Sequence, residues 1–321
     1  MGFVLRRPIL WASRRPAIKS ALTSWSLTRR VVERFVAGET IDDAIRVVGE
    51  LRAAGILATI DHLGEDITSP AQVAANVDVA LELIDGLVAA GLAEGTEISL
   101  KLSALGQPIS DDLALASART ITSAATKAGI WIDLDMEDHT TTDQTLAVLD
   151  ALRADVPSAG VALQAMLRRT PSDLDRLCGK GSRVRLVKGA YDEPGSVAVD
   201  AADIDAAYAE GLQRLFAGDG YPMVGSHDPT MIGEALSLAL KHGTGLGGFE
   251  IQMLYGIRSD EQRRLAARGH RVRAYVPFGI DWYGYFTRRL AERPANLMFF
   301  LRSFRHSRNA RVATPSTHPA P

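Results

Sequence analysis

A short run of apolar and β-branched residues recurs eight times along this chain, with longer helical patterns between the runs. Strands that alternate with helices favour a parallel sheet with helical crossovers, and eight such units in about 250 residues predict a closed (βα)8 barrel of the TIM type. An open, doubly wound sheet is the alternative, but no phosphate-binding loop follows the first run, as it would in many such sheets. The runs occupy residues 56–61, 97–102, 130–136, 161–166, 183–188, 221–226, 249–254 and 271–276, and the helical patterns occupy 70–92, 111–127, 140–154, 171–177, 201–216, 229–240 and 260–267.

The two ends of the chain differ from this repeating middle. A helical pattern at 41–53 precedes the first run, and residues 1–32 carry seven Arg or Lys but no Asp or Glu. The residues from about 305 onward are basic, rich in Pro, Ser and Thr, and poor in apolar side chains, which is typical of disorder. The sequence therefore predicts an N-terminal helical segment at 1–54, a barrel domain at 55–304 and a disordered tail at 305–321.

Charge and cysteine content narrow the class of protein. The net charge is −2 and the pI is about 6.4, which does not favour a nucleic-acid partner. The single cysteine, Cys178, excludes an intramolecular disulfide. No apolar run approaches the roughly 18 residues that a membrane span needs. We expect a cytoplasmic protein and interpret its basic N-terminus as a helix of a soluble domain, with a transit peptide or a membrane-surface helix as the alternatives.

Polar side chains gather where the predicted strands end. The carboxyl ends of the strands form the active face of a (βα)8 barrel, and a charge buried there without a partner is costly. Such residues on so many strands predict a polar ligand in the barrel mouth, although structural ion pairs are the alternative, especially for Asp61 and His62. The residues concerned are Asp61, His62, Lys101, Asp135, Gln164, Arg185, Lys188, Ser226, His227, Gln252 and Tyr275.

Three local motifs were weighed for cofactor or metal binding. The glycine-rich stretch 243–248 matches the dinucleotide fingerprint, but a helix precedes it and a strand follows, so we interpret it as a helix-to-strand turn. Histidines and carboxylates near the strand ends could be ligands of a metal-dependent hydrolase, yet the first strand lacks the His-x-His of such enzymes.

In the fifth run, strand alternation places Arg185 and Val187 on one face and Lys188 on the other. The following Gly189 and Ala190 leave backbone N–H groups accessible to a phosphate.

A pair of arginines near the C-terminus is the sharpest single feature. Arg288 and Arg289 lie one helical turn after Tyr285 and one turn before Glu292. Two adjacent guanidinium groups suit one carboxylate, and each charge-assisted hydrogen bond contributes about 1.5–3 kcal/mol. This pattern predicts a carboxylate-binding site.

Taken together and in order, these blocks resemble the proline dehydrogenase family over roughly residues 59–302. The stand-alone form is indicated, because the chain has no room for an aldehyde dehydrogenase partner domain. The matching stretches are LKLSALG, IDLDMED, ALQAML, VRLVKGAY, GSHDP, FEIQMLYG and the long block AYVPFGIDWYGYFTRRLAERPANL.

The resemblance implies a distorted (βα)8 barrel that holds FAD and oxidises L-proline to Δ1-pyrroline-5-carboxylate by hydride transfer to flavin N5, the first step of proline degradation to glutamate. It also implies that the electrons pass to a membrane quinone, and hence peripheral contact with the inner face of a membrane. It implies that Asp135 and Arg185 are catalytic, that Asp135 sits beside Lys101 and helps to hold the carboxylate pocket, and that Glu292 holds the two arginines. It places around the substrate Lys101, Leu254, Tyr275, Tyr285, Arg288 and Arg289. It places around the flavin Met136, Gln164, Arg185, Val187, Lys188, Gly189, Ala190, Ser226 and His227.

Two other functions stay open from the residues alone. One is a metal-dependent barrel hydrolase, and the other is a catalytically silent protein that binds a flavin or an amino acid. The sequence does not reveal the oligomeric state or the preference among proline analogues.

Overall fold

The computed structural model describes residues 34–64, 67–282 and 285. The chain divides into two compact units, one formed by residues 37–280 and the other by residues 1–36 together with 281–321. The predicted boundaries near residues 54 and 304 stay predictions, and the predicted tail at 305–321 lies outside the described residues. Within the described residues, no helix is both long enough and apolar enough to cross a membrane.

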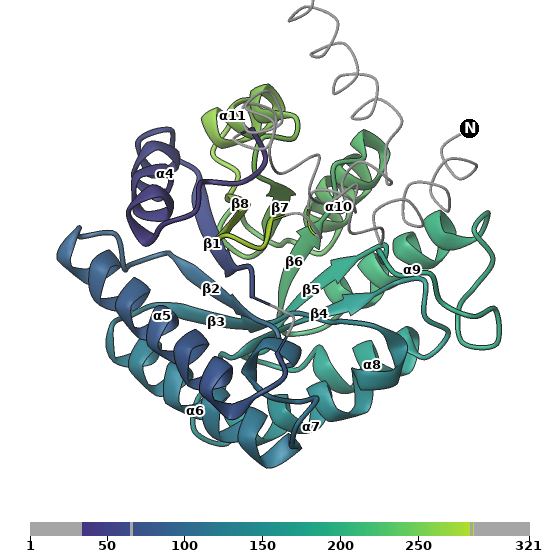
Figure 1. Ribbon diagram of the computed structural model, residues 1–321. Helices are drawn as coiled ribbons and strands as arrows, with labels where there is room; N and C mark the ends of the chain where they lie inside the picture. The colour runs from purple at the N-terminus through teal and green to yellow at the C-terminus, as the bar shows by residue number, and fades with distance from the viewer. Residues whose placement is uncertain (1–33, 65–66, 283–284, 286–321) are drawn as a thin grey trace, which may run out of the picture. The chain divides into compact units, whose positions relative to one another are not determined.

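Residues 37–280 form a closed barrel of eight parallel strands, as predicted (Figure 1). Each strand pairs with the next along the chain, and the first pairs with the last, so that no sheet edge is left. All eight predicted runs are strands, including the weak sixth one. The strands are β1 (Leu57–His62), β2 (Glu97–Leu100), β3 (Trp131–Leu134), β4 (Gly160–Gln164), β5 (Arg183–Val187), β6 (Tyr221–Gly225), β7 (Glu250–Leu254) and β8 (Val272–Phe278).

Helices connect the strands and cover the outside of the barrel (Figure 1). A short 3-10 turn, His139–Thr141, precedes the third of these connecting helices, and another, Ser103–Leu105, follows β2. The glycine-rich stretch 243–248 lies between a helix and β7, as predicted. The connecting helices are α5 (Pro70–Ala89), α6 (Asp111–Lys127), α7 (Thr142–Arg153), α8 (Thr170–Leu177), α9 (Ile204–Ala217), α10 (Pro229–Lys241) and α11 (Ser259–Ala267), and α4 (Ile41–Ala53) precedes β1.

A capping residue followed by proline predicts a helix start at Ser69-Pro70, Thr170-Pro171 and Asp228-Pro229. Two of these three predicted starts are present. Ser69 caps α5 in a capping box with Gln72, and the Asp228 side chain caps α10. The third prediction was wrong, because Arg169 occupies the cap position of α8 and Thr170 is already helical. The Thr170 hydroxyl donates instead to the carbonyl of Gln164 at the end of β4. This hydrogen bond ties the helix to the strand that precedes it.

The outward faces of the strands form the hydrophobic core with the helices. Their side chains are almost fully buried, which accounts for the apolar half of each run. Examples are Ile60, Ile98, Ile132, Leu134, Val161, Leu163, Val184, Leu186, Val224, Ile251, Met253, Ala274 and Val276.

The inward faces carry charges rather than the usual branched apolar residues. At the amino-terminal end of the barrel, Arg183 Nη2 lies 3.0 Å from Glu97 Oε2, and its guanidinium carbon lies 4.1 Å from the Trp131 ring centroid. Arg273 Nε lies 2.7 Å from Glu250 Oε1, and a second nitrogen lies 3.1 Å from Oε2. These two ion pairs close the lower end of the barrel, and the mouth is left for a ligand.

Candidate functional site

Four polar side chains from four different segments meet at the barrel mouth. Lys101, directly after β2, contacts Asp61 of β1 and lies 3.3 Å from Asp135 Oδ2 and from the Tyr275 hydroxyl. Tyr275 of β8 in turn donates to Asp135 Oδ2 at 2.5 Å. The carboxyl ends of parallel strands share one edge of the barrel, which is why residues far apart in the sequence meet here. The sequence prediction that Asp135 sits beside Lys101 is confirmed.

Arg185 of β5 lies on the interior side of this group and is 4% exposed. Its Nη2 donates to Asp135 Oδ1 and lies 2.6 Å from Asp133 Oδ2. The same nitrogen is 3.4 Å from the Ser99 hydroxyl. The other terminal nitrogen, Nη1, is buried and donates no hydrogen bond to an acceptor among the described residues. Such an orphaned N–H fits a ligand that offers an acceptor in the mouth.

The surrounding charges set the ionisation of the central groups. Burial alone would raise the pKa of Asp135, but the Arg185 guanidinium and then Lys101 outweigh it and lower that pKa to about 2. Burial, with the nearby carboxylates Asp135 and Asp61, raises the pKa of Tyr275 well above its usual value. Asp135 is therefore an anion and Tyr275 a hydrogen-bond donor throughout the neutral range. The centre is a fixed constellation of two cations, two carboxylates and one phenol.

Residues after β3 and β4 line the next part of the mouth. Met136 is nearly buried, and Gln164 at the end of β4 donates from its side-chain amide to the Glu137 carbonyl at 2.8 Å. The side chain of Glu137 receives the N–H and the hydroxyl of Ser103. Gln164 is thereby fixed in orientation beside the segment that carries Asp135.

Lys188 points away from Arg185, as the strand alternation predicted. Its ammonium lies 2.5 Å from Asp205 Oδ1 of α9 and 3.0 Å from Asp228 Oδ2, the cap of α10. Ser226 lies close by and accepts the Asp228 N–H at 3.1 Å. A phosphate at Lys188 has to share this ammonium with two carboxylates.

Gly189 follows with a backbone that only glycine adopts readily. Its φ is +111°, and a Cβ there would collide with the Met166 side chain. The turn at Gly189 and Ala190 therefore brings the backbone close to its neighbours. Val187, on the interior face, precedes this turn and is partly exposed.

The ends of β6 and β7 are tied together through His227. Its Nε2 accepts the Leu254 N–H at 2.8 Å, so the ring proton is on Nδ1. Arg258 donates to the His227 carbonyl at 2.5 Å and is the non-glycine residue with a positive φ, 51°, in the described chain. This contact fixes Leu254 at the rim.

The arginine pair and its neighbours are described only in part. Tyr285 is 5% exposed and belongs to the unit formed by residues 1–36 and 281–321. Arg288, Arg289 and Glu292 lie outside the described residues. Their predicted role in binding a carboxylate stays a prediction.

One member of the predicted cluster belongs elsewhere. The Gln252 amide donates to Glu250 at 2.6 Å and contacts the Met223 sulfur, so its partners are those of the lower ion pairs and not Lys101 or Asp135. The pattern marked it as polar and strand-borne, but its position along β7 is two residues short of the rim.

Sequence reasoning missed Asp133 and Ser99, which both touch Arg185. The signal was a period of two. Asp133 and Asp135 alternate on and directly after β3, and Ser99 and Lys101 do so on and after β2, so each pair shares the inward face. Reading every polar residue of a strand together with its i+2 neighbour would have found both.

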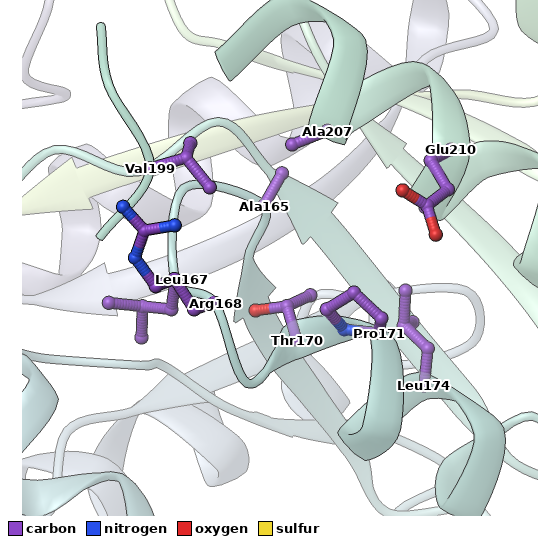
Figure 2. Close-up of a pocket in the computed structure, with 10 residues that line it drawn as sticks. Ala165, Leu167, Arg168, Thr170, Pro171, Leu174, Val199, Ala207 and Glu210 are labelled. Atoms are coloured by element: carbon purple, nitrogen blue, oxygen red, sulfur yellow. The ribbon is translucent and has the colours of Figure 1, made fainter. Parts of the chain in front are cut away.

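The pocket in Figure 2 lies apart from this centre. It has a volume of about 210 Å³ and lies where the segment after β4 meets α8 and α9, with Arg168 and Glu210 at its two sides (Figure 2). Its remaining lining is mainly apolar, for example Leu167, Pro171 and Leu174. None of the residues predicted to bind the substrate or the flavin lines it. It is also small beside the roughly 300–1,000 Å³ of typical ligand pockets.

The described residues contain no group of three or more His, Cys, Asp or Glu side chains placed to hold one metal ion. Two histidines that could have been metal ligands have other partners in the structure. His227 accepts the Leu254 N–H, and His139 pairs with Glu193.

Comparison with known proteins gives one consistent answer. The family model for proline dehydrogenase matches residues 44–302. A proline dehydrogenase of Deinococcus radiodurans is 42% identical over 92% of this chain and 96% of its own length, and proline dehydrogenase 1 of Bacillus subtilis strain 168 is 35% identical over 93% and 98%.

Solved structures agree on the fold. The crystal structure of proline utilization A from Bdellovibrio bacteriovorus, inactivated by N-propargylglycine, superposes with a TM-score of 0.76 at 24% identity. The match covers 82% of this chain and 32% of that one, so the chain spans about a third of the larger protein. From the family model, the two relatives and the barrel with its charged mouth, we conclude that this chain belongs to the proline dehydrogenase family.

Proposed function

We propose that this protein oxidises L-proline to Δ1-pyrroline-5-carboxylate with bound FAD, the first step in degrading proline to glutamate. The observation that supports this most directly is the constellation of Lys101, Asp135, Tyr275 and Arg185 at the mouth of a barrel of this family. The two relatives named above are proline dehydrogenases, and this chain matches each of them over nearly its whole length. FAD would supply the two-electron acceptor, taking a hydride at N5.

The mouth fits a flavin in two respects. Arg185 Nη1 is a buried donor that lacks an acceptor among the described residues, and a flavin ring edge offers acceptors. The turn at Gly189 exposes backbone close to the end of β5. We assign to the isoalloxazine Met136, Gln164 and Arg185, and to the rest of the cofactor Val187, Lys188, Gly189, Ala190, Ser226 and His227.

The residues of the chain would position proline for this oxidation. We assign Lys101, with Arg288 and Arg289, to the substrate carboxylate, since cations bind a carboxylate through charge-assisted hydrogen bonds. Leu254, Tyr275 and Tyr285 would form the walls around the ring. Asp135 orients Lys101, Tyr275 and Arg185 together, so a change in any one displaces the others.

Arg185 and Lys101 place positive charge near the site where electrons arrive. Negative charge that develops there is stabilised by a fixed cation in a water-poor mouth. Asp135 and Asp61 offset the mutual repulsion of the two cations when no substrate is bound. We propose a membrane quinone as the acceptor that reoxidises the enzyme, with peripheral contact at the inner membrane face.

The purified protein is expected to be yellow and to bleach when L-proline is added without oxygen. The measurement is the visible spectrum before and after addition of the substrate, with D-proline as the matched control. A protein that stays colourless after incubation with FAD would contradict the proposal. A yellow protein whose colour L-proline leaves unchanged would contradict the substrate.

Changing Arg288 or Arg289 to methionine is expected to raise KM for L-proline about 10- to 100-fold. Each change removes a charge-assisted hydrogen bond of about 1.5–3 kcal/mol to the carboxylate. Steady-state kinetics measure this, and the exposed Arg264→Met on α11 is the control. An unchanged KM in both variants would refute the carboxylate assignment.

A further inference from the structure

Asp133 is a fully buried carboxyl group next to the proposed catalytic arginine. Its side chain is 0% exposed, and its Oδ2 lies 2.6 Å from Arg185 Nη2. Asp135, directly after β3, contacts the same nitrogen from the side of the mouth. Arg185 is therefore held between two carboxyl groups, one facing the ligand and one facing the interior.

The two carboxyl groups are held very differently. Asp135 receives aligned hydrogen bonds from Arg185 and Tyr275 and has Lys101 at 3.3 Å. Neither oxygen of Asp133 receives a hydrogen bond of good geometry from the described residues. A buried carboxylate without such donors is strongly disfavoured relative to the neutral acid.

The local packing is built around the Asp133 side chain. Gly160, opposite it on β4, has no Cβ, and a Cβ there would collide with Asp133 Oδ1. The carboxyl group thus occupies space that a larger residue on β4 would fill. Its side chain therefore packs directly against the backbone of β4.

Charged groups face Asp133 from every side. They are Arg183 and Arg185 on β5, Glu97 on β2, Asp135 directly after β3 and Arg153 on α7. Burial, which outweighs the attraction of Arg185, raises the pKa of Asp133 to about 8. Glu97 and Asp135 raise this pKa further.

The charge count inside the barrel agrees with a neutral Asp133. With Asp133 protonated, the charges of the ion-paired groups in the described interior cancel. The cations are Lys101, Arg183, Arg185 and Arg273, and the carboxyl groups are Asp61, Glu97, Asp133, Asp135 and Glu250.

We propose that Asp133 is a positioning residue that, in its neutral form, holds Arg185 from the interior and leaves the positive charge of that arginine directed at the mouth. Asp133 does not touch the ligand and acts through Arg185. When Asp133 loses its proton, the second anion offsets Arg185, and negative charge in the mouth becomes less favourable.

The consequence for a bound flavin rests on the proposed function. Reduction adds negative charge to the ring, so a neutral Asp133 favours the reduced form and an ionised one opposes it. The ratio of reduced to oxidised flavin at a fixed applied potential should therefore report the proton on Asp133.

The decisive comparison is between the wild-type protein and Asp133→Asn, a neutral residue of the same shape. At about pH 6 the two should show the same flavin ratio, allowing for a constant offset, since both are neutral there. At about pH 10 the ratio in the wild type should fall at least about threefold relative to the variant. Asp150→Asn, an exposed aspartate on α7 paired with Arg176, should follow the wild type at both pH values.

A second measurement needs neither a flavin nor a variant. NMR of aspartate-labelled, flavin-free wild-type protein should show one carboxyl group that titrates near pH 8. If all aspartates titrate below about pH 6, the neutral form is ruled out. A parallel fall of the flavin ratio in wild type and Asp133→Asn overturns the link to Arg185. If the protein binds no flavin, the NMR titration still decides the state of Asp133, and only the proposed function fails.

Discussion

Replacing Asp135 with asparagine is expected to lower kcat/KM for L-proline by about a hundredfold or more. Asp135 is the common partner of Lys101, Tyr275 and Arg185, and its removal takes from the two buried cations the anion that they share. Asparagine fills the same space but turns an amide NH2 toward the two cations. Both cations then lose their anchor, and the proposed carboxylate and flavin contacts lose their geometry.

Steady-state kinetics test this expectation, with Asp150→Asn on the exposed face of α7 as the matched control. Surface ion pairs of this kind contribute about 0–1 kcal/mol, so the control should retain wild-type rates. Circular dichroism and flavin content show whether the variant is folded and loaded. A folded, flavin-loaded Asp135→Asn with wild-type kcat/KM would remove Asp135 from the centre of the site.

The pH dependence follows from the direction of the pKa shift. The pKa of Asp135 lies near 2, below its ordinary value of 3.8. A lowered carboxyl pKa contributes stability that is present above the unfolded value and is lost as pH falls from about 4 to 2. No loss of activity between about pH 5 and 8 should therefore be traceable to Asp135.

The barrel could be predicted because each strand carries its own signal. Every predicted run is a strand, since β-branched outward-facing residues such as Ile98 and Ile132 pack under helices whose caps are also readable. The cap predicted at Thr170 failed because a nearby carbonyl, that of Gln164, competes for its hydroxyl. Local patterns do not show such competition.

The mouth could be predicted only in part. Lys101, Asp135 and Tyr275 stand at strand ends, and their meeting follows from the barrel alone. The pairing of Asp133 with Arg185 is harder to predict, because Arg185 lies two strands away on β5 and the stagger of the strands decides which side chains meet. No sequence pattern in residues 130–136 predicts which arginine Asp133 contacts.

The lower ion pairs show the same limit more sharply. Arg183 and Glu97 are 86 residues apart in the chain. The carboxylate closest to Arg273 is that of Glu250 and not that of Glu97. The sequence shows that charges alternate into the barrel, but the closed geometry selects each pair. The effect of removing one of these charges on stability can therefore be predicted only from the structure.

Replacing Arg273 with methionine is expected to lower the free energy of unfolding by about 3–5 kcal/mol. Arg273 makes two contacts with Glu250 and donates to the Ala58 carbonyl at 2.8 Å, all inside the barrel. Without it, the Glu250 carboxylate stays buried with hydrogen bonds from Gln252 and Tyr221, and among the described residues its nearest cation is Arg183 at 3.7 Å. A buried charge that loses its partner carries its full desolvation cost.

Denaturant unfolding measures this, with Arg176→Met as the control because Arg176 is exposed and pairs only at the surface. That control should change the unfolding free energy by less than about 0.5 kcal/mol. Removing both charges, with Arg273→Met and Glu250→Leu, should restore part of the loss, because the orphaned carboxylate is then gone. If the double variant is no more stable than Arg273→Met alone, the cost lies in packing around the arginine stem and not in the buried charge.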